Sequence, residues 1–364
     1  VLFRSEEKSM AAIGFNRFHQ YADEFKLVAR YRDGRHVEDW QYYRMRNFAD
    51  EVFKMATAWR MLGLKPQETV AIMSPNRPRW ASTFSSLMMF NAAVVPVYPT
   101  LTADEAAYIM RDAGTRFAVV NSRDQAEKVL SQVASLPLLE KVFVMDAGEV
   151  PDNDRLASYD ALVAMAEGKA DANDVARGIP DIAEDDIGAI IYTSGTTGRP
   201  KGAVLTNANF LSQRAALGCF DLSEDDVFLN HLPFSHSFGL TTDLLGTIMA
   251  GAQLVIADGI APDQIRYALT TIRPTVLMSV PRLFEKIFMQ VQGVVAAKPE
   301  RVQALISSAL DLGKQLFDLR NEGRPVPMSL TLRSVLARRI IRKVLRQAGM
   351  DRVRIAFAGG APIS

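Results

Sequence analysis

The stretch Y-T-S-G-T-T-G-R-P-K-G occupies residues 192–202 and directly follows the apolar run I-G-A-I-I at residues 187–191. The apolar run predicts a buried strand that ends near Tyr192 and leads into a loop. Glycines let backbone N–H groups turn toward an anion, hydroxyl groups add donors, and Lys201 adds a positive charge. This combination predicts a loop that binds phosphate groups. A flexible surface turn between two strands is the alternative interpretation.

The spacing of the glycines does not fit a Walker-type phosphate loop. That loop requires four residues between its glycines and a Ser or Thr directly after the Lys. Here two residues separate Gly195 from Gly198, and Gly202 follows Lys201. A conventional P-loop nucleotide hydrolase is therefore disfavoured. ATP hydrolysis in the absence of a carboxylic acid substrate would support that interpretation again.

Strand-like apolar runs alternate with helical patterns on both sides of the loop. Alternation of this kind predicts a parallel sheet with covering helices. After the loop, residues 203–205 are expected to form a returning strand and Asn207 to begin a helix. The predicted fold class is α/β, and the family resemblance described below implies two mostly parallel sheets with covering helices. The other predicted strands cover residues 70–73, 93–98, 117–120, 227–232, 254–257, 275–279 and 354–358, and the clearest helices cover residues 47–62, 80–90 and 102–113.

Composition restricts the partners and the compartment. The 364 residues include 42 basic and 41 acidic side chains, so the formal net charge is +1 and no global field favours nucleic acid. The single cysteine, Cys219, excludes an internal disulfide, and no His/Cys spacing suggests a zinc site. No apolar stretch reaches the roughly 20 residues that a membrane-spanning helix needs. A cytoplasmic location is expected.

Three segments in order resemble the motifs of the adenylate-forming enzymes, the superfamily of acyl-coenzyme A synthetases, luciferases and peptide-synthetase adenylation domains. The loop at 192–202 resembles the family signature. The segment H-L-P-F-S-H-S-F-G-L at 231–240 resembles the second motif, L-P-x-x-H-x-x-G, and A-G-G-A-P-I at 358–363 resembles the following glycine motif. The runs S-P-N-R-P-R-W at 74–80 and V-P-V-Y-P-T-L-T at 95–102 resemble the opening subdomain of long-chain acyl-coenzyme A synthetases.

The resemblance implies a reaction and a set of phosphate ligands. In that family the loop closes over the β- and γ-phosphates of ATP while a carboxylate attacks the α-phosphorus, which gives an acyl adenylate and pyrophosphate. Coenzyme A then displaces AMP. ATP, Mg²⁺ and coenzyme A are the implied cofactors and co-substrates, and a fatty acid is the implied substrate. The implied phosphate-binding residues are Thr193, Ser194, Gly195, Thr196, Thr197, Gly198 and Lys201.

Histidine and glycine residues after the loop carry the other candidate contacts. From the residues alone, His236 is a general base, a gate or a core residue. The resemblance implies that it lines the acyl pocket beside the adenylate in a positioning or gating role, whereas His231 receives no role. Gly359, Gly360 and Ala361 are implied to contact adenine and the acyl group. The acidic Mg²⁺ ligand is expected beyond Ser364.

The segment between the second and third motifs gives the substrate clue. From Pro281 to Gly359 there are 78 positions, an insertion that resembles the long-chain fatty acyl branch. Between Arg320 and Arg354 there are ten basic and two acidic residues, and the stretch Leu336–Arg346 reads as a basic amphipathic helix. Three interpretations stay open: peripheral contact with the inner membrane face, attraction of coenzyme A phosphates, and a core-facing helix with a solvated basic face.

The prediction for the whole chain is an incomplete N-terminal AMP-binding domain over residues 1–364, with subdomains at about 40–180 and 181–364. The small barrel and the C-terminal domain with its catalytic lysine are expected beyond Ser364. Residues 1–364 are therefore expected to be inactive alone. The predicted function is that of a long-chain fatty acid–coenzyme A ligase. The alternatives are a fatty acyl-AMP ligase, a ligase for another carboxylate, and a non-catalytic nucleotide- or lipid-binding module.

Overall fold

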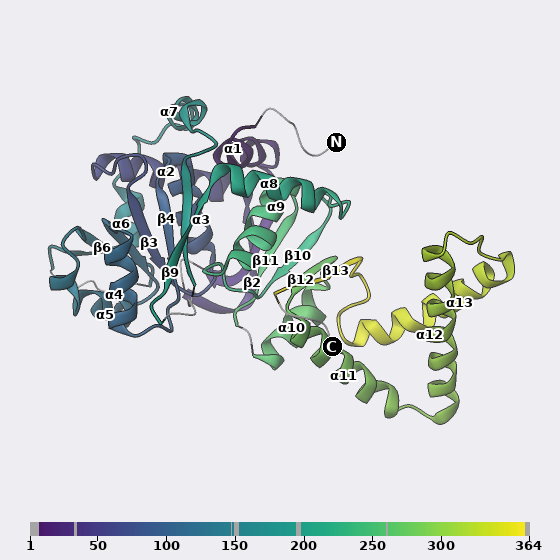
Figure 1. Ribbon diagram of the computed structural model, residues 1–364. Helices are drawn as coiled ribbons and strands as arrows, with labels where there is room; N and C mark the ends of the chain where they lie inside the picture. Colours follow the sequence, from purple (N-terminus) through teal and green to yellow (C-terminus); the bar gives the residue numbers. More distant parts are fainter. Residues whose placement is uncertain are drawn as a thin grey trace. The chain divides into compact units, whose positions relative to one another are not determined.

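A computed structural model describes residues 7–32, 35–146, 148, 153–193, 198–259 and 261–360. The chain divides into two compact units, Val1–Asp258 and Gly259–Ser364. Both units combine strands with helices (Figure 1). The subdomain boundary expected near residue 181 stays a prediction.

Within the described residues, the first unit holds a seven-stranded sheet in the order β7-β6-β5-β3-β4-β8-β9. Every neighbouring pair is parallel except β8 and β9, which are antiparallel. The predicted parallel sheet with strands at 70–73, 93–98, 117–120 and 187–192 is confirmed. The strands are β3 (Thr69–Met73), β4 (Ala93–Val97), β5 (Phe117–Val120), β6 (Lys141–Val144), β7 (Leu156–Ser158), β8 (Ile187–Thr193) and β9 (Lys201–Thr206).

Both faces of this sheet are covered, as its continuous apolar strands predict. Successive strand residues point to opposite faces. Ala118 and Val120 of β5 belong to a core cluster that contains Ile109 from helix α4 (Ala103–Asp112). Phe117 packs instead against Trp59 of helix α2 (Met45–Met61), with 6.0 Å between ring centroids. The alternation along one strand therefore builds two cores, one on each side of the sheet.

A second sheet in the first unit runs in the order β10-β11-β1-β2. Strands β10 (Val227–Asn230) and β11 (Gln253–Ile256) are parallel to each other, and β1 (Phe25–Arg32) is parallel to β11. Strand β2 (Arg35–Arg44) is antiparallel to β1 and mostly exposed. The two sheets of mostly parallel strands confirm the α/β fold class. The remaining helical elements of this unit are α1 (Met10–Gln20), α3 (Pro78–Phe90), α5 (Arg123–Leu130), α6 (Tyr159–Ala164), α7 (Ala172–Gly178), α8 (Asn207–Gly218), the π-helix η3 (Gly239–Leu245) and α9 (Gly246–Ala250).

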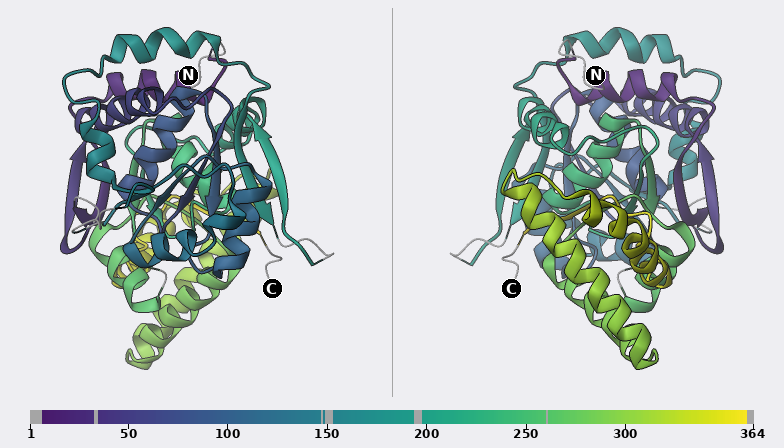
Figure 2. Two further views of the ribbon diagram at one scale, coloured as in Figure 1. Left: turned by 90° about the vertical axis from the view of Figure 1, so that its left-hand side faces the viewer. Right: turned by 90° about the vertical axis from the view of Figure 1, so that its right-hand side faces the viewer.

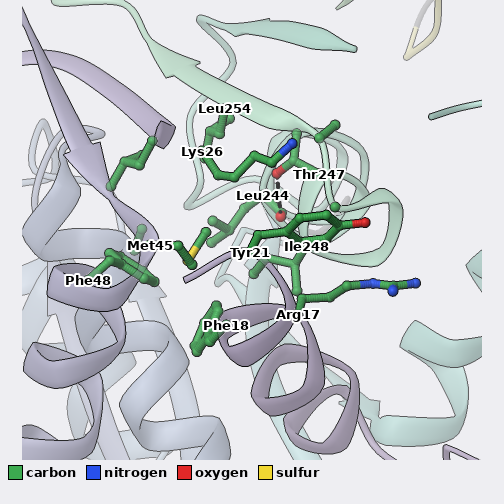
Figure 3. Close-up of a pocket in the computed structure, with 14 residues that line it drawn as sticks. Arg17, Phe18, Tyr21, Lys26, Met45, Phe48, Leu244, Thr247, Ile248 and Leu254 are labelled. Carbon is green, nitrogen blue, oxygen red and sulfur yellow. Dashed lines mark hydrogen bonds between the residues drawn. The ribbon is translucent and has the colours of Figure 1, made fainter. Parts of the chain in front are cut away.

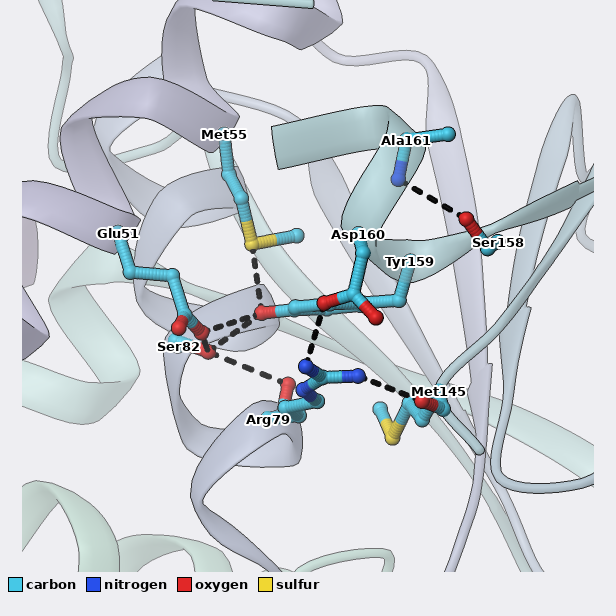
Figure 4. A network of polar contacts seen from close by, with 9 residues as sticks. All are labelled: Glu51, Met55, Arg79, Ser82, Met145, Ser158, Tyr159, Asp160 and Ala161. Carbon is cyan, nitrogen blue, oxygen red and sulfur yellow. Dashed lines mark hydrogen bonds and ion pairs between the residues drawn. The ribbon is translucent and has the colours of Figure 1, made fainter. Parts of the chain in front are cut away.

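Residues 74–80, named here the β3–α3 turn, comprise the loop after β3 and the first three residues of α3, and they join several elements. Arg79 is buried, and its guanidinium donates to Asp160 Oδ1 and to the carbonyl of Met145, each at 2.5 Å. It also lies 4.6 Å from the ring centroid of Tyr159. The Tyr159 hydroxyl in turn donates to Glu51 at 2.5 Å, so α2, α3 and α6 share one polar network (Figure 4).

The same turn places Trp80 in the apolar core. Trp80 is fully buried, stacks on Phe84 at 5.5 Å and contacts Phe234 at 5.1 Å between ring centroids. An aromatic side chain of this kind buries roughly 150–250 Å² of surface. At about 25 cal/mol per Å² this burial stabilises the fold by several kcal/mol. Trp80 thereby attaches the β3–α3 turn to the segment after β10.

The second unit contains a parallel strand pair and long helices (Figure 1 and Figure 2, green to yellow). Strands β12 (Val276–Ser279) and β13 (Ile355–Ala358) pair directly, as expected for the strands predicted at 275–279 and 354–358. Gly349 has a φ of +72°, and a Cβ there would lie 2.2 Å from the carbonyl oxygen of Leu269. The turn before β13 therefore needs glycine. The helices are α10 (Pro262–Ile272), α11 (Pro281–Ala296), α12 (Glu300–Asn321) and α13 (Met328–Gln347).

Helix α13 contains the basic amphipathic stretch. Four residues of its predicted apolar stripe are half-buried, and α13 packs along α12. Leu336, the fifth, has 61% of its surface exposed. The core-facing interpretation therefore accounts for most of the stripe but not for Leu336. The four half-buried residues are Ile340, Ile341, Val344 and Leu345.

Candidate nucleotide-binding site

The predicted phosphate loop connects the antiparallel strands β8 and β9 (Figure 2, teal arrows). Tyr192 pairs with Gly202, and Thr193 pairs with Lys201. The returning strand expected after the loop is confirmed, and α8 begins at Asn207 with Thr206 as its N-cap. Thr193 and Lys201 are thus placed on opposite arms of a hairpin. The predicted ligands Ser194, Gly195, Thr196 and Thr197 lie outside the described residues.

Helix α4 holds both arms of the hairpin. The hydroxyl of Tyr192, on the first arm, donates to Asp112 Oδ2 at 2.7 Å. The hydroxyl of Tyr108 donates to the carbonyl of Pro200, on the second arm, at 3.2 Å. The Arg199 guanidinium lies 5.6 Å from the centroid of the Tyr108 ring, within reach of a cation–π interaction. The ends of the loop are therefore fixed to one helix of the scaffold.

Two glycines of the motif have distinct steric reasons. Gly198 has a φ of +99°, a conformation that side chains with a Cβ rarely adopt. At Gly202 a Cβ would lie 2.8 Å from Ile190 Cγ2 and 3.0 Å from the Tyr192 ring. Glycine therefore allows the second strand to approach the first closely at the base of the loop.

A pocket of about 610 Å³ adjoins the second arm of the hairpin. Its lining combines aromatic side chains with charges of both signs, from Tyr98, Tyr108, Arg111, Arg199, Asp104 and Glu105. Small-molecule sites commonly have volumes of about 300–1,000 Å³. The space beside the hairpin can therefore accommodate a small ligand.

A second cavity, between α1, β1, α2 and η3, is much smaller (Figure 3). Its volume is about 30 Å³, and its lining is mostly apolar, with Phe18, Phe48 and Leu244 among the contributors. A volume of this size holds about one water molecule. It excludes a nucleotide or an acyl chain.

His236 lies in the turn that follows β10 and is exposed. Its Nδ1 accepts a hydrogen bond from the backbone N–H of Phe238 at 3.1 Å. In the neutral imidazole the proton is therefore on Nε2, which is the nitrogen left to donate to a ligand. His231 is buried instead, and burial lowers the pKa of His231 to about 4. His231 consequently stays neutral and belongs to the core.

The spacing of the L-P-x-x-H-x-x-G motif has a steric explanation. The backbone N–H of His236 donates to the carbonyl of Pro233 at 3.0 Å and closes a turn. A Cβ at Gly239 would lie 2.4 Å from the same carbonyl oxygen and 2.9 Å from that of Leu232. The π-helix η3 therefore packs directly on the turn, and glycine is required at the contact. π-Helical turns occur frequently at functional sites.

Sequence reasoning missed three polar residues that hold this turn: Asn76, Asn230 and Asp243. Asn230 and Asp243 are buried, and burial raises the pKa of Asp243 to about 7. Asn76 is in the S-P-N-R-P-R-W run at 74–80, whose sequence indicates only a family resemblance. The sequence signal for two of them was a polar residue in an apolar segment: Asn230 ends an apolar strand and Asp243 is inside an apolar helix.

Gly359 and Gly360 belong to the second unit and follow β13. The backbone N–H of Gly359 donates to the carbonyl of Ser279 at 2.9 Å, and Gly360 has a φ of +81°. Their predicted contacts with adenine and the acyl group stay predictions. Ala361 lies outside the described residues.

The part of the chain that the structure describes shows neither a metal-binding cluster nor a membrane-spanning helix. In that part, no cluster of three or more His, Cys, Asp or Glu side chains could hold a metal ion. Among the same residues, no helix is both long enough and apolar enough to span a bilayer. The Mg²⁺ ligand expected beyond Ser364 stays a prediction.

Comparison with known families decides the affiliation. The family described as AMP-binding enzyme matches residues 20–364. The chain belongs to this family. A long-chain fatty acid–CoA ligase of Rattus norvegicus is 28% identical over 370 residues, which cover 98% of this chain and 47% of the relative. A long-chain fatty acid–CoA ligase of Mycobacterium bovis is 27% identical, with 98% and 57% covered. This AMP-binding family member thus spans about half the length of the curated relatives it matches.

Solved structures share the fold of this family member. The inhibitor-bound N-terminal domain of FACL13 from Mycobacterium tuberculosis aligns with a TM-score of 0.60 at 21% identity, over 76% of this chain and 64% of that one. ATP-bound MatB from Rhodopseudomonas palustris aligns with a TM-score of 0.59 at 21% identity, over 76% and 50%. These similarities support the architecture.

Proposed function

We propose that this AMP-binding family member activates a long-chain fatty acid with ATP and transfers the acyl group to coenzyme A. The observation that carries the proposal is the hairpin at 187–206, in which α4 binds the residues at both ends of the glycine- and hydroxyl-rich segment, in a chain of the AMP-binding family. The names of the curated relatives support the fatty acid as substrate.

The proposed reaction has two steps. A carboxylate oxygen of the fatty acid forms a bond to the α-phosphorus of ATP, and the bond from this phosphorus to pyrophosphate breaks. The sulfur of coenzyme A then bonds to the acyl carbon, the bond from this carbon to the AMP oxygen breaks, and AMP and the thiol proton are released. Stabilisation of the charge that develops on the phosphates is the source of rate in such transfers.

The family resemblance supplies the role that we propose for each residue. Thr193, Gly198, Lys201 and the loop residues 194–197 hold the leaving phosphates, with Mg²⁺ as the counter-ion. His236 Nε2 faces the acyl adenylate and positions it, while Gly359, Gly360 and Ala361 contact adenine and the acyl group. The attacking carboxylate needs no base, so no proton transfer is assigned to His236.

Fatty-acid-dependent exchange of labelled pyrophosphate into ATP, measured on the full-length gene product, tests the proposal. We expect exchange with long-chain acids and thioester formation when coenzyme A is added. Lys201→Ala should raise the KM for ATP by about tenfold, equal to about 1.4 kcal/mol. Lys169→Ala is the matched control, because Lys169 is an exposed lysine distant in sequence from the loop.

The outcomes separate the alternatives. Exchange without thioester formation would indicate an acyl-AMP ligase that uses another acceptor. Exchange only with other carboxylates would change the substrate class. Nucleotide binding without any acid-dependent exchange would support a non-catalytic binding module and overturn the proposal.

We also propose that helix α13 contacts anionic membrane lipid from which fatty acid is drawn. Met328, Leu332 and Leu336 are 81%, 68% and 61% exposed. Arg339, Lys343 and Arg346 are exposed too. Spacings of three or four residues place all six on one face, apolar toward the N-terminus and basic toward the C-terminus. Such a face complements anionic headgroups and acyl chains.

Vesicle sedimentation of the full-length gene product tests the membrane contact. We expect binding to phosphatidylserine-containing vesicles that weakens at high salt. Replacing Leu332 and Leu336 by Gln should abolish binding, whereas Lys169→Glu, a control for loss of one exposed lysine, should not. Equal sedimentation of wild type and the double variant would overturn this contact without affecting the proposed reaction.

A further inference from the structure

The histidine turn, residues 230–236, is held from one side by Asn76. Asn76 Nδ2 donates to Asn230 Oδ1 and to the carbonyl of Leu232, each at 2.7 Å. Asn76 Oδ1 accepts from the backbone N–H of Phe234 at 2.8 Å. Both ends of one side-chain amide therefore bind the turn, which fixes its distance and its orientation relative to the β3–α3 turn.

Asn230 and Asp243 hold the turn from within. Asn230 Nδ2 donates to the carbonyl of Leu232 at 2.9 Å and to Asp243 Oδ2 at 2.7 Å. Asp243 Oδ1 accepts from the Thr242 hydroxyl at 3.3 Å. Asp243 is only 1% exposed, and the groups that donate to its carboxylate oxygens, the Asn230 amide and the Thr242 hydroxyl, are both neutral. A buried carboxyl group without a counter-ion lowers the stability of the fold. Its hydrogen bonds to neighbouring groups therefore explain why a carboxyl group occupies this position.

The turn transmits this arrangement to His236. The His236 N–H donates to Pro233, one residue after the carbonyl that Asn76 and Asn230 bind. The Nδ1 of His236 accepts from Phe238, at the start of the helical segment that contains Asp243. Both the backbone and the ring of His236 are therefore attached to groups that the network fixes.

We propose that Asn76 and Asp243 are positioning residues that orient His236 Nε2 toward the acyl adenylate, an inference that rests on the proposed function of His236. Neither residue touches the reacting atoms. Asn76 acts through the turn, and Asp243 acts through Asn230. A small displacement of a positioning group can cost up to about 100-fold in rate.

A double-mutant cycle on the full-length gene product tests this proposal. Asn76→Ala is expected to lower the rate of acyl-adenylate formation at least about tenfold in the wild type but less than about twofold in His236→Ala. Ser86→Ala is the matched control, because it removes the buried hydrogen bond that Trp59 of α2 donates to Ser86 of α3, away from the turn. Its small effect should be the same in both backgrounds. Equal effects of Asn76→Ala in both backgrounds would overturn the proposal.

A second measurement does not depend on activity. In ¹⁵N-labelled full-length gene product, the wild-type His236 should show the Nε2-protonated tautomer, and Asn76→Ala should shift it toward a mixture of tautomers. An unchanged tautomer would contradict positioning through the turn. The two failures are distinguishable: if wild type shows no acid-dependent exchange, the proposed function fails, whereas if His236→Ala lowers the rate but the cycle is additive, only the positioning fails.

Discussion

The Tyr192 hydroxyl donates a 2.7 Å hydrogen bond to Asp112 Oδ2 and so joins the last turn of α4 to the strand that precedes the predicted phosphate loop. Burial, then this hydrogen bond, raises the pKa of Tyr192, so the phenol remains a donor at physiological pH. Because Tyr108 of the same helix donates to the carbonyl of Pro200, α4 anchors the residues at both ends of the loop.

Tyr192→Phe should therefore loosen the loop. Removing a hydrogen bond to a charged acceptor costs about 1.5–3 kcal/mol, and this loss should appear in urea unfolding. The KM for ATP should rise while the KM for fatty acid stays constant. Tyr42→Phe, at an exposed tyrosine of β2, is the control. An unchanged KM for ATP would show that α4 does not set the loop geometry.

Gly239→Ala should displace the histidine turn. Its Cβ would meet the Pro233 carbonyl oxygen at 2.4 Å, and such overpacking costs about 1–3 kcal/mol. We expect that loss in thermal unfolding, together with slower acyl-adenylate formation.

Gly293→Ala is the matched control for the Gly239 variant. Gly293 lies inside α11, and a Cβ there meets no atom within 4 Å. Alanine at that site should stabilise the helix by about 0.5–1 kcal/mol. Equal responses of the two glycines would contradict the steric explanation of the motif.

Asp243 should make stability depend on pH. Burial raises the pKa of Asp243 from 3.8 to about 7, so between these values the folded state binds more protons than the unfolded state. The free energy of unfolding should then fall as pH rises from about 4 to 7, by up to about 4 kcal/mol, and level off above pH 7.

Asp243→Asn removes this titration while it keeps the size and an acceptor oxygen. As pH rises from 4 to 7, the wild type should lose up to about 4 kcal/mol of unfolding free energy and the variant should not. The variant should therefore gain stability relative to the wild type over this range. Urea unfolding at pH 5, 6 and 7.5 measures it. A difference that does not vary with pH would show that Asp243 is ionised throughout.

Arg79→Lys should separate stability from catalysis. Arg79 binds Asp160, the Met145 carbonyl and the Tyr159 ring at once, which the single ammonium group of lysine does not reproduce. A loss of about 1–3 kcal/mol in urea unfolding is expected, with an unchanged rate per folded molecule. A lowered rate in the fully folded variant would mean that the Arg79 contacts also affect the geometry of the candidate site.

The scaffold was predictable where local signals are strong. Strands β3, β4 and β5 are continuous apolar runs, and helix α4 starts at a capping box formed by Thr102 and Glu105. The hairpin β1–β2 was not predicted, because the mostly exposed β2 carries polar residues on both faces and gives no alternation. Its pairing partners are set by the sheet around it.

The sequence by itself determined the α/β class, the hairpin that presents the glycine-rich loop, and the family motifs, because apolar periodicity, caps and glycines act over a few residues. Only the tertiary structure decided that Asn76 binds Asn230, 154 positions away in the chain, and that Asp243 is buried beside them. Such contacts arise from how sheets and helices pack together. No local pattern encodes which polar side chains will meet when water is excluded from between them.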